Sequence, residues 1–124
     1  MLYRDASTSA HLPYENETWN EAIPSFEVQL RPLDELVKTG EIRPPDFIKV
    51  DVEGHGHKAL AGAAHTLEIH RPIIMMGFHS ETEVTETKRL LEPLGYRFNP
   101  INPLATPDCI GWDYILRPES LPPA

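Results

Sequence analysis

The chain has 124 residues, of which 40% are hydrophobic, and it carries a net charge of -8. This length gives one small domain with enough apolar residues for a core. Because Lys and Arg form no cluster, nucleic acid is excluded as a partner, since its phosphates require concentrated positive charge. No apolar run approaches a membrane span, and the lone Cys109 fits a reducing compartment, so we expect a cytoplasmic protein without a membrane span.

The first third of the chain predicts a loop followed by two short elements. Residues 7–24 are polar and rich in turn formers, and they include Trp19. Residues 26–31 alternate between apolar and polar, which predicts a half-buried strand. Pro32 then opens a short helix to Lys38, which Gly40 closes.

The stretch from Phe47 to Gly54 predicts a central strand that ends in charges. In an extended chain its charged and apolar residues lie on opposite faces. Burying ionised groups costs several kcal/mol each unless they are paired or lie at a solvated strand end. We therefore expect a functional site at that end. The charged residues are Lys49, Asp51 and Glu53, and the apolar ones are Ile48, Val50 and Val52.

Two strand–helix units follow, which predicts an α/β fold with right-handed crossovers. Residues 58–70 have helical periodicity, and residues 73–78 form a short apolar run that His79 closes. Asp51, Glu53 and His79 would then lie at the carboxyl ends of two parallel strands, where open α/β sheets bind ligands.

A second helix should begin at Ser80, because Ser80 and Glu83 have the spacing of a capping box. Pro93 should end it by about Glu92. Strands over residues 95–98 and 110–116 should follow, separated by a proline-rich loop, and the tail from Pro118 should fray.

These features resemble the FkbM family of S-adenosylmethionine-dependent methyltransferases. The resemblance implies a class I methyltransferase fold, of which residues 1–117 form the carboxyl-terminal part and residues 118–124 a flexible tail. This partial Rossmann-like fold would lack the first strands and the glycine-rich cofactor loop. Gly77 stands where members of the family often carry a glutamate. The matching residues are Leu33 to Leu36, Pro45 to Gly54, Leu60, Gly62-Ala63, Arg71-Pro72, His79 and Gly95-Tyr96.

Asp51 and His79 are the candidate catalytic residues. Asp51 could orient a substrate hydroxyl, and an imidazole that titrates near neutral pH could accept its proton. Lys49, Glu53 and His55 are the candidate substrate-binding residues. Structural alternatives stay open: Asp51 could pair with Lys49, Glu53 could favour a helix N-terminus, and His79 could be structural.

The resemblance implies a parent enzyme that methylates a hydroxyl of a sugar, glycolipid or natural product. Residues for binding S-adenosylmethionine are unknown, and we do not expect this chain alone to bind it. A chain cut before its central strand should expose a sheet edge, so a homo-oligomer is possible. The alternatives are a noncatalytic remnant or interaction module, and a metal-dependent hydrolase using Asp51, His55, His57 and His79.

Overall fold

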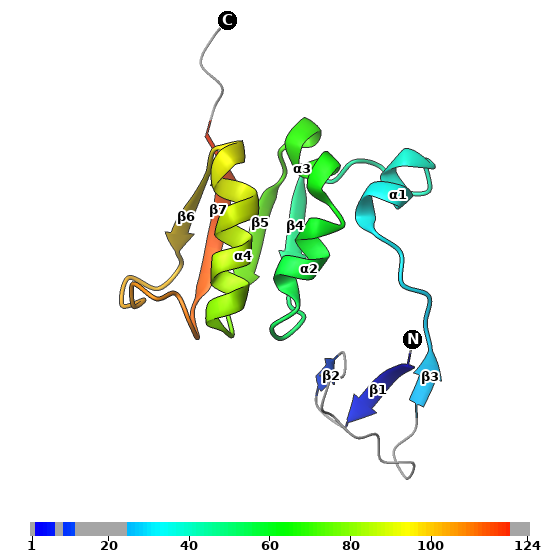
Figure 1. Cartoon of the computed structure of the whole chain (residues 1–124), viewed down its shortest axis with the longest axis horizontal. Helices are drawn as coiled ribbons and strands as arrows, with labels where there is room; N and C mark the ends of the chain where they lie inside the picture. Colours follow the sequence, from blue (N-terminus) through cyan, green and yellow to red (C-terminus); the bar gives the residue numbers. More distant parts are fainter. Residues whose placement is uncertain (1, 7–8, 12–24, 120–124) are drawn as a thin grey trace, which may run out of the picture. The chain divides into compact units, whose positions relative to one another are not determined.

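The computed structural model describes residues 2–6, 9–11 and 25–119, and its chain divides into two compact units, residues 1–31 and 32–124. The first unit contains a three-stranded antiparallel sheet in the order β2-β1-β3 (Figure 1). Part of the predicted loop over residues 7–24 forms β2, while Trp19 lies outside the described residues. The strand predicted over residues 26–31 is shorter and earlier than expected. The strands are β1 (Leu2–Ala6), β2 (Ser9–His11) and β3 (Ser25–Glu27).

The second unit is built on a four-stranded mixed sheet in the order β4-β5-β7-β6. β4 and β5 are parallel, as the two strand–helix units predict, and β7 runs antiparallel to both β5 and β6. The α/β prediction is therefore confirmed. The strands are β4 (Phe47–Val50), β5 (Ile73–Gly77), β6 (Tyr96–Pro100) and β7 (Asp113–Pro118).

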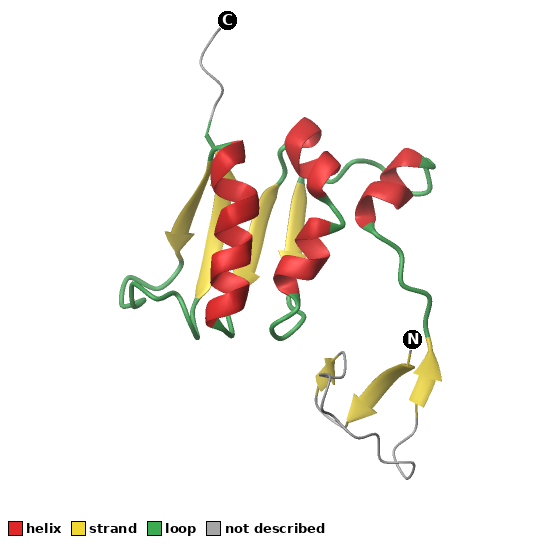
Figure 2. Cartoon of the chain, viewed as in Figure 1, coloured by secondary structure: helices red, strands yellow, loops and turns green. Residues whose placement is uncertain are grey.

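Helices α2, α3 and α4 cover one face of this sheet (Figure 2). The burial of successive side chains alternates along the strands. Ile74 and Leu116 are fully buried on the helix-covered face, whereas their neighbours Met75 and Ile115 are half-buried on the other face. No described helix within residues 32–119 is long and apolar enough to cross a bilayer. The helices are α1 (Leu33–Lys38), α2 (Gly56–Ala61), α3 (Ala64–His70) and α4 (Glu81–Leu91), and the 3-10 turn η1 (Glu92–Leu94) follows α4.

The helix predicted over residues 58–70 is two helices, because α1 packs against the break between them. The Asp34 N–H donates to the Gly62 carbonyl at 3.0 Å, and the Asp34 carboxylate accepts the N–H groups of His65 and Thr66. Burial acts to raise the pKa of Asp34, but these bonds and the Thr66 hydroxyl outweigh it and lower the pKa. Asp34 thus caps α3 from another helix.

Three other boundaries differ from the sequence prediction. β4 ends at Val50, because the chain turns at residues 52–54 and the His55 N–H donates to the Val52 carbonyl. β7 begins at Asp113, since residues 109–112 form turns that return the chain to the sheet. Pro118 ends β7, and Glu119 donates its N–H to Gly95, so the sheet extends one residue beyond the predicted start of the tail.

Candidate functional site

Asp51 and His79 lie at the same end of the second sheet, beyond the carboxyl ends of the parallel strands β4 and β5. Asp51 directly follows β4, and His79 lies two residues after β5, its parallel neighbour. Both side chains are exposed, and 45% of the His79 side chain is accessible to solvent. The described residues form no ion pair between Asp51 and Lys49, so the structural alternative for Asp51 finds no support. No hydrogen bond joins Asp51 directly to His79 among these residues.

The predicted shared face of Lys49, Asp51 and Glu53 is wrong, because β4 ends before the last two of them. Lys49 is an exposed residue within β4. Glu53 lies in the following turn with φ 42°, in the left-handed region that non-glycine residues seldom adopt. His55 is half-buried and precedes the first residue of α2. The candidates therefore share one loop rather than one strand face.

A buried carboxylate that the sequence prediction assigned only to capping connects this loop to His79. Glu83 in α4 is 1% exposed. Its Oε2 accepts the N–H of Gly56 at 2.8 Å, and its Oε1 accepts the N–H of His79 at 2.7 Å. Half of the capping box is confirmed, since Ser80 Oγ accepts the Glu83 N–H at 3.1 Å. The Glu83 side chain thus joins the loops that follow β4 and β5.

Asp113 is a second residue of this edge that the sequence analysis missed. Because β7 is antiparallel, its first residue pairs with Gly77, the last residue of β5. A Cβ atom at Gly77 would lie 2.6 Å from Asp113 Oδ1 and 3.7 Å from His79 Cε1. The Asp113 carboxylate therefore occupies the space beside Gly77, next to the imidazole. The sequence signal was weak, since nothing in the chain indicated that the last strand runs antiparallel beside β5.

The histidines of the loop do not gather into a metal site. Within the described ranges, no group of three His, Cys, Asp or Glu side chains could hold a metal ion. His57 lies inside α2, whereas His55 precedes the first residue of this helix. The metal-dependent hydrolase therefore lacks a ligand cluster in the part of the chain that the structure describes.

The closely spaced glycines Gly54 and Gly56 do not form a cradle for S-adenosylmethionine. A Cβ atom at Gly56 would collide with Met76 Cε and lie 2.9 Å from Glu83 Oε2 and 3.2 Å from Val50 Cγ1. Its backbone is thus packed against the protein interior, and its N–H already binds Glu83. The residues described in this loop do not fit the cofactor by themselves.

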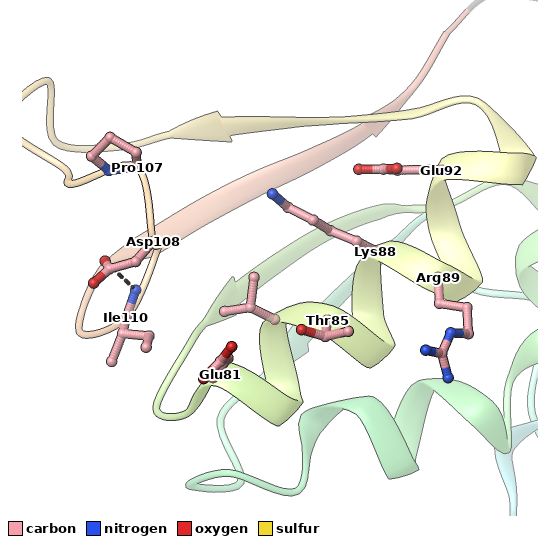
Figure 3. A pocket seen from close by; sticks show the side chains of 9 residues that line it. Glu81, Thr85, Lys88, Arg89, Glu92, Pro107, Asp108 and Ile110 are labelled. Carbon is pink, nitrogen blue, oxygen red and sulfur yellow. Dashed lines mark hydrogen bonds between the residues drawn. The ribbon is translucent and has the colours of Figure 1, made fainter.

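A shallow groove of about 640 Å³ lies elsewhere, between α4 and the loop that joins β6 to β7 (Figure 3). Lys88 extends from the helix toward this loop, where the Ile110 N–H binds the Asp108 carboxylate. None of the predicted site residues lines the groove. The lining residues are Glu81, Val84, Thr85, Lys88, Arg89, Glu92, Pro107, Asp108 and Ile110.

The sequence matches the methyltransferase FkbM domain over residues 2–98. The chain belongs to the FkbM methyltransferase family. The hexuronic acid methyltransferase AglP of Haloferax volcanii is 34% identical to it over 58 residues, which are 47% of this chain and 24% of AglP. The FkbM chain thus spans about a quarter of the length of this curated relative. No solved structure gives a significant match.

The residues that carry the FkbM resemblance have different tasks in the structure. Asp34 caps α3, as described above. At the amino end of β5, the Tyr96 hydroxyl donates to the Pro72 carbonyl at 2.6 Å, and Arg71 lies 6.0 Å from the centroid of the Tyr96 ring. Burial raises the pKa of Tyr96 to about 12, although the Arg71 charge lowers it. These residues therefore stabilise the fold.

Proposed function

We propose that this chain provides the acceptor side of an S-adenosylmethionine-dependent O-methyltransferase. Family membership supports methyl transfer, and one observation supports the location: Glu83 fastens the loop after β4 to the loop after β5. This contact joins the backbone of Gly56, which follows the loop that contains Asp51, to the backbone of His79. We further propose that the units over residues 1–31 and 32–124 belong to one methyltransferase domain, because the family match spans both.

In this proposal the acceptor is a hydroxyl group, and the chain's residues orient it and take its proton. Asp51 accepts a hydrogen bond from the acceptor, and His79 Nε2 receives the proton of the reacting hydroxyl. Lys49, Glu53 and His55 contact the remainder of the acceptor, and Asp113 adds a carboxylate beside His79. S-adenosylmethionine supplies an electrophilic methyl group when it is bound. Residues other than Gly54 and Gly56 must bind it, because the loop that contains these glycines does not fit it.

The charge at the edge favours a neutral acceptor. Asp113 has its carboxylate beside Gly77 and next to His79, Asp51 and Glu53 follow the neighbouring strand β4, and the whole chain carries a net charge of -8. A carboxylate on the acceptor would be repelled by like charges, whereas the hydroxyls of a neutral sugar can donate to them. AglP is named for a hexuronic acid, which is anionic at neutral pH. We therefore propose a neutral sugar, glycolipid or natural-product hydroxyl as the acceptor of this protein.

The test is methyl transfer by the longest protein that contains residues 1–124, with labelled S-adenosylmethionine and matched neutral and uronic sugar acceptors. His79→Asn should lower kcat by about 10²- to 10⁴-fold, the usual contribution of a general base. Glu92→Gln, an exposed change at the far end of α4, is the matched control. An unchanged kcat in His79→Asn removes the base from the mechanism. Failure of the unmodified protein to methylate any hydroxyl would favour a noncatalytic interaction module.

A further inference from the structure

The buried Glu83 carboxylate is placed between two groups of the candidate site. Its Oε1 lies 2.7 Å from the His79 backbone nitrogen and 3.4 Å from the His79 ring nitrogen Nδ1. Its Oε2 is occupied by the N–H of Gly56 in the first turn of α2. Glu83 itself lies in the first turn of α4, so the N-terminal ends of two helices face one carboxylate.

We propose that Glu83 is a positioning residue that holds His79 in the tautomer protonated at Nδ1. In a neutral imidazole, the hydrogen bond made by one nitrogen decides which nitrogen carries the proton. An ionised carboxylate can only accept, so the ring nitrogen that faces it must donate. Nε2 then presents a lone pair and makes no hydrogen bond to the described residues. This inference rests on the proposed function, in which Nε2 receives the acceptor's proton.

A carboxylate is required at this position because two backbone donors approach its two oxygens separately. Glutamine has the same shape but offers only one oxygen, so its NH₂ group would face the N–H of either Gly56 or His79. Aspartate is one methylene shorter and cannot reach both donors from the same helix position. The geometry therefore couples two tasks of Glu83: it joins the two loops, and it sets the protonated nitrogen of the ring.

The tautomer can be read directly in the full chain by NMR of ¹⁵N-labelled histidine, independently of catalysis. The chain has 6 histidines, and His79→Asn identifies the signals of His79. At a pH where the ring is neutral, the unmodified protein should show Nδ1 protonated and Nε2 unprotonated. Glu83→Gln should reduce the population of this tautomer. It should also accelerate hydrogen exchange of the Gly56 and His79 amides relative to the unmodified chain.

Ser80→Ala is the matched control, because it removes a capping hydrogen bond from the same helix turn without touching the imidazole. It should leave the His79 tautomer unchanged. If Glu83→Gln does not fold, the unmodified chain decides alone: Nδ1 protonation supports the inference, and Nε2 protonation overturns it. A folded Glu83→Gln protein with an unchanged tautomer also overturns it. Both proposals stand if His79→Asn loses methyl transfer and the unmodified protein shows Nδ1 protonated. If His79→Asn transfers methyl groups at an unchanged rate, the proposal that His79 is the base is overturned, and the inference about its tautomer is not.

Discussion

Replacing Gly56 with alanine tests whether the loop after β4 is closed by packing or open to a ligand. Gly56 begins α2 and is not among the glycines with positive φ, so alanine suits its backbone. Helix propensity alone predicts that Gly56→Ala stabilises the protein by up to about 1 kcal/mol. The surroundings of Gly56 predict the opposite.

The new methyl group would overlap Met76 Cε and press on Glu83 Oε2 at 2.9 Å. Met76 is 1% exposed and Glu83 equally buried, so neither side chain can make room by turning into solvent. Overpacking of this kind costs about 1–3 kcal/mol, and weakening the hydrogen bond to a charged Glu83 adds about 1 kcal/mol or more. After subtracting the helix gain, we expect Gly56→Ala to destabilise the chain by about 2 kcal/mol, a factor of roughly 30 in the folding equilibrium.

The assay is urea denaturation followed by circular dichroism, at a chain concentration low enough to limit association. The midpoint should fall while the slope with urea stays constant. Ala59→Gly, an exposed change in the same helix, measures the propensity effect without the overlap and should cost about 1 kcal/mol. If Gly56→Ala stabilises the chain, the loop is open, and Gly54 to Gly56 becomes the candidate cofactor cradle.

Three further predictions concern the capping carboxylate, the candidate site and the sheet edge. Asp34→Ala should cost about 1–2 kcal/mol at neutral pH. Folding lowers the pKa of Asp34. Its contribution to the free energy of unfolding is therefore complete at a pH above its pKa in the unfolded chain, near 3.9, and is lost as the pH falls through its pKa in the folded chain. Urea midpoints that differ equally at pH 7 and in strong acid would contradict this. In a complete parent enzyme, Asp51→Asn should slow single-turnover methyl transfer but shift stability by less than about 0.5 kcal/mol, since Asp51 is exposed; an unchanged rate would remove Asp51 from the mechanism. The isolated chain should self-associate, because β4 pairs with β5 alone among the described strands and its residue Phe47 is 52% exposed. It should not bind S-adenosylmethionine at micromolar concentration. Light scattering that shows a stable monomer would refute the predicted self-association. Calorimetry that shows micromolar binding of S-adenosylmethionine would refute the second prediction.

The sequence predicted those parts of the fold that depend on local periodicity. The parallel pair of β4 and β5, the Ser80 cap and the end of α4 before Pro93 all follow from spacing within one or two turns. The break between α2 and α3 could not be predicted, because Asp34 stabilises it from about thirty residues away. Local pattern carries no information about such a partner.

The candidate site shows the same division between local and distant determinants. Asp51 and His79 are predicted from the sequence because each follows an apolar strand, and their roles stay a prediction. Glu83 was read as a capping residue, and its bond to Gly56 depends on how α2 and α4 pack. Asp113 was missed because its position beside Gly77 depends on the direction and place of the last strand. Strand order is a tertiary property, and it decides that Asp113 lies beside Gly77.

The strand order also has a consequence for synthesis on the ribosome. β7 leaves the exit tunnel after β5 and β6, yet it lies between them, and β6 pairs with no other described strand. Until β7 emerges, β6 has no backbone partner among the described strands, and the edge of β5 that β7 later pairs with stays open to chaperones or to other nascent chains. Because Asp113 arrives with β7, it takes its place beside Gly77 only in this step. A premature stop before residue 113 would therefore cost the sheet two strands rather than one.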